Sequence, residues 1–209
     1  MSSIKHVSFD LDGTLINSFS TMKIAWEAAT AKLHINCGFA EYRRYVGLPF
    51  PKIMEMLGLS NYLTELNELY FAGTRRLYDQ IPVIEGANAL IDECKARGLG
   101  TSIITSKPRR NSELILEKMG FEVDRLMCGD DYSKGKPDPM AGQILCEEMG
   151  LSPSEVLYVG DAIFDFQFAL NTGMQFVLFT DGGANRLPSN MLNPVASVPE
   201  LSQVAGMLG

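Results

Sequence analysis

The sequence has little of what marks proteins that bind nucleic acids or span membranes. It contains 25 acidic and 18 basic residues, giving a formal net charge of −7, and the basic residues form no stripe. No apolar run approaches membrane-spanning length, and the opening "MSSIKHVSF" lacks a charged-then-apolar signal. We therefore expect a cytoplasmic protein with no nucleic-acid partner and no membrane partner.

Cysteine and histidine are also scarce. The four cysteines show no CxxC pair and no metal-type spacing, which predicts buried or half-buried free thiols in a reducing compartment. The two histidines, His6 and His34, have no partners at useful spacing, so both are expected at the surface. Neither residue type indicates a disulfide framework or a metal site.

What the chain does have is a regular alternation of helix and strand signals from Val83 onward. Helical patterns close on a glycine, which supplies the left-handed position after a helix, and a short β-rich run follows. Each run is almost continuously apolar, which is typical of a parallel sheet covered by helices on both faces. These runs are "LGTSIIT", "VDRLMCG", "VLYVGD" and "QFVLFT", in addition to residues 4–9. The expected fold class is α/β with a doubly wound parallel sheet.

Residues 18–81 interrupt this alternation. They contain no strand-like run, and two apolar stripes at helical spacing indicate helices: Met22, Ala25, Trp26, Ala29 and Leu33, then Leu63, Leu66, Tyr70 and Leu77. An insertion directly after a strand's carboxyl end lies over the crevice where open α/β sheets bind ligands. We therefore expect a core of residues 1–17 and 82–209 and an all-helical cap of residues 18–81.

The first expected strand ends in "DLDGTLIN", with two carboxylates one residue apart. Strand alternation puts Asp10 and Asp12 on the same side, where like charges repel and burial raises their pKa values. A divalent cation would compensate this cost. The alternative is an ordinary Asp-Gly turn, and the polar ends of the other strands argue against it.

Polar groups also follow the other expected strands, as "TSK", as "CGDD" with "KGKPDP", and as "GDAIFD". Carboxylates in excess suit a hard cation such as Mg²⁺, and hydroxyl and ammonium groups beside it suit phosphate. Asp10 can then act as a nucleophile that forms an aspartyl-phosphate, and Asp12 can act as a general acid and base.

In this order, "DLDGTL", the hydroxyl after the second strand, the Lys-Pro of "GKPDP" and "GDAIFD" resemble the haloacid dehalogenase superfamily over nearly the whole chain. The helical insertion between the first two motifs resembles the group containing phosphoglycolate phosphatases and β-phosphoglucomutases. The resemblance implies a Mg²⁺-dependent phosphatase that hydrolyses small phosphorylated metabolites through an aspartyl-phosphate.

Carried over residue by residue, the resemblance assigns catalytic roles to four positions. Asp10 is the nucleophile and Asp12 the acid and base. Thr105 binds the transferring phosphoryl group, and Lys136 neutralises the nucleophile and the phosphate. Lys134 competes with Lys136 for this role, but the following Pro-Asp-Pro favours Lys136.

The resemblance also implies a metal site. Asp161 ligates Mg²⁺ beside Asp10 and the backbone carbonyl of Asp12, and Asp165 supports the metal through water. Gly13 and Ser106 are expected to contact the substrate. Lys107 is expected to start a helix instead, and Asp130 and Asp131 to cap a loop.

Three other functions are weighed against the phosphatase. A sugar phosphomutase of the same superfamily carries a His shortly after the nucleophile motif, where Met22 stands here. A signalling receiver domain is shorter and has its acceptor Asp after a later strand. Superfamily members that cleave carbon–halogen bonds lack the second Asp of the first motif, which is present here as Asp12. All three are therefore disfavoured.

The residues that select the substrate are expected in the insertion, in "RRYVGLPFPK". Its Gly and Pro residues suggest a loop that faces the crevice, where Arg43 or Arg44 can grip an acidic group such as the carboxylate of phosphoglycolate. The alternative is a pair of solvated arginines. The sequence leaves monomer and homodimer open.

Overall fold

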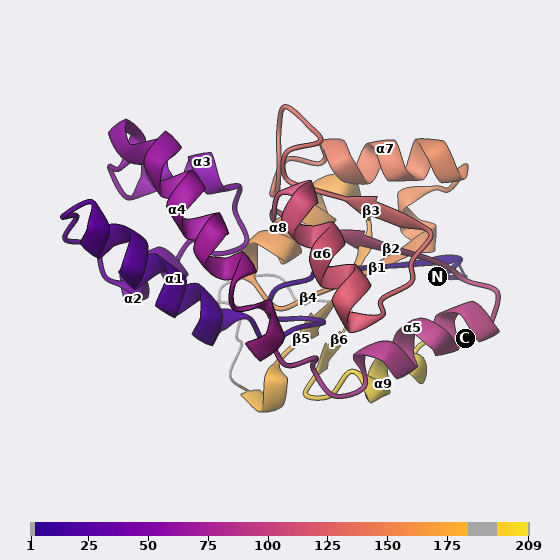
Figure 1. The fold of residues 1–209 in the computed structure, drawn as a ribbon. Coiled ribbons are helices and arrows are strands. Elements are labelled where there is room, and N and C mark those ends of the chain that lie inside the picture. Colours follow the sequence, from indigo (N-terminus) through magenta and orange to yellow (C-terminus); the bar gives the residue numbers. More distant parts are fainter. Residues whose placement is uncertain (1–2, 184–195, 209) are drawn as a thin grey trace.

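The computed structural model describes residues 3–183 and 196–208, and these form a six-stranded sheet in which all neighbouring strands are parallel (Figure 1). The strand order is β3-β2-β1-β4-β5-β6. The strands are β1 (His6–Phe9), β2 (Gly100–Ile104), β3 (Arg125–Met127), β4 (Val156–Gly160), β5 (Gln175–Phe179) and β6 (Ala196–Val198). The expected α/β class with a parallel sheet is confirmed.

The central strand β1 is where the strand order reverses. It pairs with β2 on one side, in the register His6 to Gly100, and with β4 on the other, in the register Phe9 to Val159. In a doubly wound sheet, ligands bind outside the carboxyl ends of the strands at such a reversal. Residues that directly follow β1 and β4 are therefore the ones that the topology brings together.

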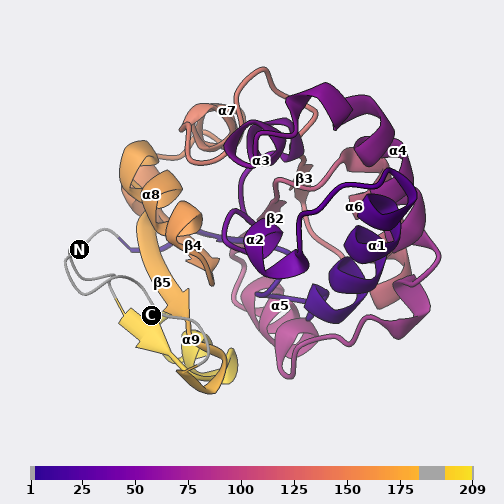
Figure 2. The same ribbon diagram turned by 90° about the vertical axis from the view of Figure 1, so that its left-hand side faces the viewer.

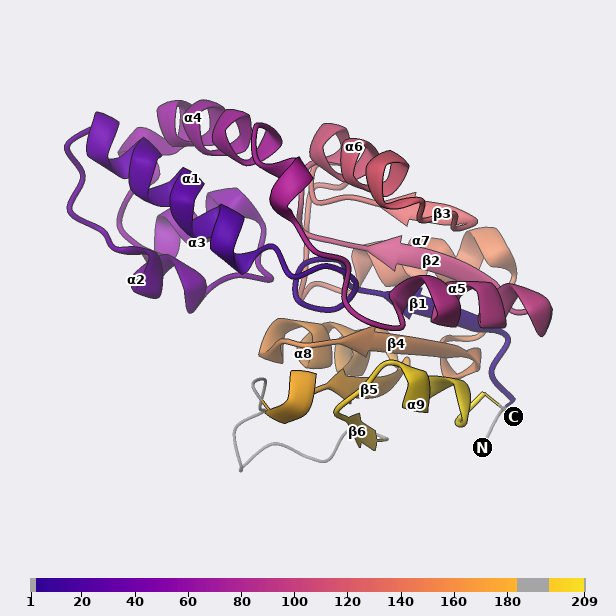
Figure 3. The same ribbon diagram turned by 60° about the horizontal axis from the view of Figure 1, so that its bottom comes forward.

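Helices cover both faces of the sheet (Figure 3). Apolar residues of α5 (Ala87–Ala96), α6 (Arg109–Met119) and α9 (Ser202–Ala205) pack on one face. The opposite face packs against α7 (Met140–Met149) and α8 (Ile163–Thr172). The sheet is thus buried on both sides, which explains why its strands are almost continuously apolar.

The chain between β1 and β2 contains the predicted helices. They are α1 (Phe19–Lys32), α2 (Phe39–Arg43), α3 (Phe50–Met56) and α4 (Leu63–Arg75), with short 3₁₀ turns at Ser60–Tyr62 and Tyr78–Gln80. These elements enclose a hydrophobic cluster of their own, separate from the clusters on the sheet, and lie to one side of the sheet (Figures 1 and 2). We call residues 18–81 the helical insertion. The domain limits at these residues stay a prediction.

Aromatic side chains form the centre of the insertion. The Trp26 ring stacks on Tyr42 with centroids 4.3 Å apart, and Phe50 stacks on Tyr70 at 5.5 Å. Four residues of the predicted first stripe are buried: Met22, Ala25, Trp26 and Ala29. Close-packed aromatic rings hold the short helices together where helix propensity alone would not.

Two details differ from the sequence predictions. His6 was expected at the surface but is fully buried. Its ring lies against Gly100 of the neighbouring strand β2, where any side chain would collide with it. The strand β6 was missed, since it is only three residues long and its sequence carries little strand signal.

The cysteine prediction is confirmed: all four are free, three of them buried and Cys37 half-buried. Within the described ranges, the structure contains no helix that is both long and apolar enough to cross a membrane.

Candidate active site

A cavity of about 380 Å³ lies between the carboxyl ends of the strands and the helical insertion. The core contributes residues that follow β1, β2 and β4, among them Asp10, Thr105 and Asp161. The insertion contributes side chains of α1 to α4 and the loop before α3. The sheet topology thus brings together residues that are widely separated in the sequence.

Lys136 connects two of the predicted carboxylates. Its Nζ lies 2.5 Å from Oδ1 of Asp10 and 2.7 Å from Oδ1 of Asp165, and it donates to the Tyr158 hydroxyl at 3.0 Å. All four side chains are buried. Because its two carboxylates favour the charged form, the pKa of Lys136 is raised well above its usual value despite burial. Lys136, not Lys134, is the lysine that faces Asp10, and Lys134 is exposed beside Asp138.

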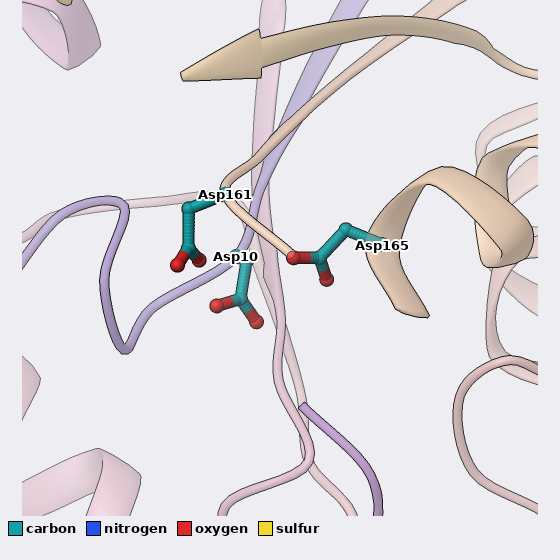
Figure 4. A group of neighbouring side chains, drawn as sticks. All are labelled: Asp10, Asp161 and Asp165. Carbon is teal, nitrogen blue, oxygen red and sulfur yellow. The ribbon is translucent and has the colours of Figure 1, made fainter. Parts of the chain in front are cut away.

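Asp10, Asp161 and Asp165 form a buried cluster (Figure 4). One carboxylate oxygen from each residue lies within 4.8 Å of the others. Burial raises the pKa of Asp161 well above its usual value and that of Asp10 to about 7, and Lys136 opposes both shifts. The neighbouring carboxylates raise both pKa values further.

The cluster fits a divalent cation. Among the described residues, its three carboxylates are paired with a single ammonium group, that of Lys136, so the ionised cluster carries excess negative charge away from water. The Thr14 hydroxyl donates to Asp161 at 3.2 Å, which relieves little of this charge. Oxygen ligands of this kind are those that Mg²⁺ and similar hard cations take.

Gly13 leaves the room that Asp161 needs. A Cβ at Gly13 would lie 2.4 Å from Oδ2 of Asp161, and the glycine has a φ of +95°. The Gly13 amide donates to the Ile16 carbonyl at 2.8 Å. The structure therefore gives Gly13 a steric reason to be glycine, while its predicted contact with substrate stays a prediction.

Asp12 lies apart from the cluster and is held by two other residues. Its Oδ1 accepts a hydrogen bond of 2.5 Å from the Ser18 hydroxyl, and its Oδ2 lies 3.0 Å from Nζ of Lys107. The expectation that Lys107 begins a helix is wrong, because α6 begins at Arg109 and Lys107 stays in the turn after β2. Pro108 follows Lys107 directly, and a proline disfavours helical backbone at the residue before it.

The two hydroxyls after β2 have different contacts. Oγ1 of Thr105 accepts from the Lys107 amide at 3.2 Å, within the buried turn that lines the cavity. Oγ of Ser106 instead donates to the Gly47 carbonyl of the insertion at 2.6 Å. Both residues line the cavity, while their predicted contacts with the phosphoryl group and the substrate stay predictions.

Arg43 and Arg44 also line the cavity, and both are exposed. The Arg43 guanidinium lies 4.3 Å from the centroid of the Phe19 ring.

Asp130 and Asp131 cap a loop as expected: Asp130 accepts from the Arg109 amide at 2.7 Å and Asp131 from the Cys128 amide at 2.7 Å.

Sequence reasoning missed four residues that contact the predicted site: Thr14, Ser18, Lys107 and Tyr158. The proline after Lys107 was a usable signal. Tyr158 stands in an otherwise aliphatic strand, and a buried tyrosine hydroxyl usually needs a polar partner. Nothing in the sequence pairs Thr14 or Ser18 with a distant or nearby carboxylate.

Comparison with known proteins agrees with this geometry. The family model "Haloacid dehalogenase-like hydrolase" matches residues 7–179. The chain belongs to that family. The phosphoglycolate phosphatase of Thiobacillus denitrificans is 29% identical over 98% of this chain and 96% of its own length. That of Vibrio cholerae is 32% identical over 83% of each chain.

Among solved structures, a hydrolase from Pseudomonas syringae superposes with a TM-score of 0.85 at 24% identity, covering 98% of this chain and 97% of its own. This likeness shows the fold. The expected family is confirmed, and so is the expectation that the protein is a hydrolase acting on phosphate monoesters. The substrate of this protein and the roles of its single residues stay proposals.

Proposed function

We propose that the protein is a Mg²⁺-dependent phosphatase of small phosphorylated metabolites that works through an aspartyl-phosphate. The observation that carries this proposal is the placement of Asp10. It ends the central strand, borders the cavity, contacts Lys136 and lies beside the carboxylates of Asp161 and Asp165. A nucleophile in this position has the positive charge of Lys136 beside it, and the neighbouring carboxylates can hold the cation that a transferring phosphoryl group needs.

In the first step, a carboxylate oxygen of Asp10 attacks phosphorus and the bond from phosphorus to the ester oxygen breaks. Lys136 neutralises charge on Asp10 and on the phosphoryl oxygens, and Thr105 holds the phosphoryl group from the end of β2. The protonated form of Asp12 gives its proton to the departing ester oxygen, so that the product leaves as an alcohol.

In the second step, water attacks the phosphorus of the aspartyl-phosphate, and the Asp12 carboxylate takes the proton of that water. The bond between phosphorus and Asp10 breaks, which returns the free carboxylate and releases inorganic phosphate. Ser18 and Lys107 orient Asp12 for both transfers, because they hold its two oxygens.

Asp10, Asp161 and the backbone carbonyl of Asp12 would hold the Mg²⁺, with Asp165 in support. When bound, the ion neutralises excess carboxylate charge and stabilises the charge that develops on the phosphoryl oxygens. The excess of buried carboxylates supports this assignment.

The substrate that we favour is phosphoglycolate or a similar small acid. The phosphoglycolate phosphatases among its relatives support this choice, as do Arg43, Arg44 and Lys107 around the cavity. The free cysteines suit a reducing compartment such as the cytoplasm. Turnover as a sugar phosphomutase is the alternative within the same chemistry.

Trapping the phospho-enzyme tests this function. The protein with Mg²⁺ and an activated aryl phosphate is quenched in acid during turnover, and mass spectrometry locates the added phosphoryl group. We expect it on Asp10 in the wild type and not in Asp10→Asn. Asp92→Asn, which changes an exposed residue of α5, is the control. Hydrolysis by Asp10→Asn at the wild-type rate would contradict the proposal.

A further inference from the structure

We propose that Lys107 binds an anionic group of the substrate that is separated from the ester oxygen by a single carbon, and thereby selects phosphorylated 2-hydroxy acids. This inference rests on the proposed function and deepens it. It concerns the part of the substrate that is not transferred. It does not concern the phosphoryl group, which Lys136 and Thr105 hold.

The first observation is the burial of an incompletely paired cation. The Lys107 side chain is 4% exposed and lines the cavity. An ammonium group has three N–H donors. Its contact is with Oδ2 of Asp12 at 3.0 Å, and the described residues provide no further hydrogen-bond or ion-pair partner for it. Buried donors without acceptors are costly, so a ligand oxygen that takes them is strongly favoured.

The second observation is the position of this cation relative to the chemistry. Asp12 protonates the ester oxygen in the proposed reaction, and Lys107 contacts Asp12 directly. The Asp12 carboxylate therefore lies between the two groups: in the proposed reaction it is within hydrogen-bond distance of the ester oxygen, and it is 3.0 Å from Nζ of Lys107. A substrate group that meets Lys107 must therefore be attached close to the ester oxygen. A carboxylate on the next carbon satisfies this condition and also supplies a charge opposite to that of lysine.

The arginines at the cavity cannot replace this contact. Arg43 and Arg44 are exposed, and the guanidinium of Arg43 lies over Phe19. An exposed cation attracts anions in general but discriminates weakly, because water solvates it as well. Lys107 is desolvated, and its contact is the one expected to distinguish a carboxylate from a neutral group of similar size.

The experiment measures binding without turnover. In the Asp10→Asn background with Mg²⁺, isothermal titration calorimetry gives the Kd of phosphoglycolate and of 2-hydroxyethyl phosphate. These two esters have the same chain length and differ in a carboxylate against a hydroxymethyl group. We expect phosphoglycolate to bind more tightly. Lys107→Met should weaken phosphoglycolate roughly 10- to 150-fold, the range of a charge-assisted hydrogen bond, and 2-hydroxyethyl phosphate less than threefold.

Two further variants complete the test. Lys107→Arg keeps the charge and should retain part of the preference for phosphoglycolate. Lys134→Met makes the same chemical change at an exposed lysine and should leave both Kd values unchanged. Circular dichroism shows whether Lys107→Met is folded. If it is not, the preference of the Asp10→Asn protein with Lys107 intact and the preference of its Lys107→Arg variant decide the question.

Equal Kd values for the two esters in the Asp10→Asn protein would overturn the inference without any Lys107 variant. An equal loss for both esters in Lys107→Met would also overturn it, because Lys107 would then only position Asp12. Neither result affects the proposed phosphatase activity, which is measured separately by phospho-enzyme formation on an aryl phosphate. That activity can therefore fail or stand independently of the role of Lys107.

Discussion

The Ser106 hydroxyl and the Gly47 carbonyl join the two sides of the active-site cavity by a hydrogen bond of 2.6 Å. Ser106 follows β2 in the core and Gly47 lies in the loop before α3 of the helical insertion. The Phe164 ring closes on the same loop, since a Cβ at Gly47 would lie 3.1 Å from it. The residue that connects the insertion to the strand ends is thus a direct neighbour of Thr105, which we propose binds the transferring phosphoryl group.

Removing this hydrogen bond should loosen the loop. We expect Ser106→Ala to raise the KM of small substrates about two- to tenfold, the value of one ordinary hydrogen bond, with little change in phospho-enzyme formation at saturation. Amide hydrogen exchange of residues 45–49 should become faster while exchange in β1 stays the same. Unchanged exchange in this loop would show that Phe164 alone holds it closed.

The proposed metal site gives a prediction on stability. Asp161 is buried among like charges and its pKa is raised, so its ionised form is unfavourable without a cation. We expect Asp161→Asn to raise the Tm of the metal-free protein and to remove the further rise that Mg²⁺ gives the wild type. The exposed Asp92→Asn is the control and should respond to Mg²⁺ as the wild type does. If Asp161→Asn keeps the full Mg²⁺ response, Asp161 does not bind the ion.

The leaving group separates the roles of Asp10 and Asp12. Asp12→Asn should lower phospho-enzyme formation roughly 10²- to 10⁴-fold with an alkyl phosphate, whose leaving oxygen needs a proton. An activated aryl phosphate needs little protonation and should be affected much less. Rapid-quench measurement of phospho-enzyme formation compares the two substrates. Equal losses for both would argue against Asp12 as the proton donor.

The arginines at the cavity should act through long-range attraction. Reversing both charges in Arg43→Glu with Arg44→Glu should lower kcat/KM for phosphoglycolate roughly tenfold at low salt, and this loss should shrink in high salt because both residues are exposed. A neutral aryl phosphate carries no acidic group beyond its phosphate and should lose less. A salt-independent loss on both substrates would instead place the arginines among the residues that support the fold.

The sequence predicted the parts of this protein that depend on local patterns. The apolar runs predicted β1 to β5, and the polar residues at the strand ends predicted the cluster of Asp10, Asp161 and Asp165. Parallel topology makes such a prediction possible, because strand ends that are far apart in the sequence meet at one edge of the sheet.

What the sequence did not reveal depends on contacts between distant segments. Lys107 was read as the start of a helix, and only the fold shows that its side chain reaches Asp12. His6 was expected at the surface. Its burial depends on the glycine at position 100 of the neighbouring strand, and the pairing of these two residues is visible only in the fold. Neither contact leaves a periodic signal in one sequence.

His6 makes the stability of the protein sensitive to acid. Its Nε2 lies 2.9 Å from Oγ of Ser102, which is 2.6 Å from Oγ of Ser8, and its Nδ1 has no partner among the described residues. Burial lowers the pKa of His6 from 6.5 to about 4, and Asp124 opposes this shift. The buried ring is thus neutral in the folded protein at pH values where an unfolded chain would protonate it.

The sign of the effect follows from this difference. Between pH 6.5 and pH 4 the unfolded chain binds the proton more readily, so the contribution of His6 to stability is complete above pH 6.5 and is lost as the pH falls toward 4. The loss is about 2 kcal/mol at pH 5 and about 3 kcal/mol when complete. We expect His6→Gln, which does not titrate, to lose less unfolding free energy than the wild type between pH 7.5 and pH 5, as measured by urea denaturation at both values. The exposed His34→Gln is the control, and its pH dependence should match that of the wild type. An identical pH dependence in His6→Gln and the wild type would contradict the lowered pKa of the buried His6 ring.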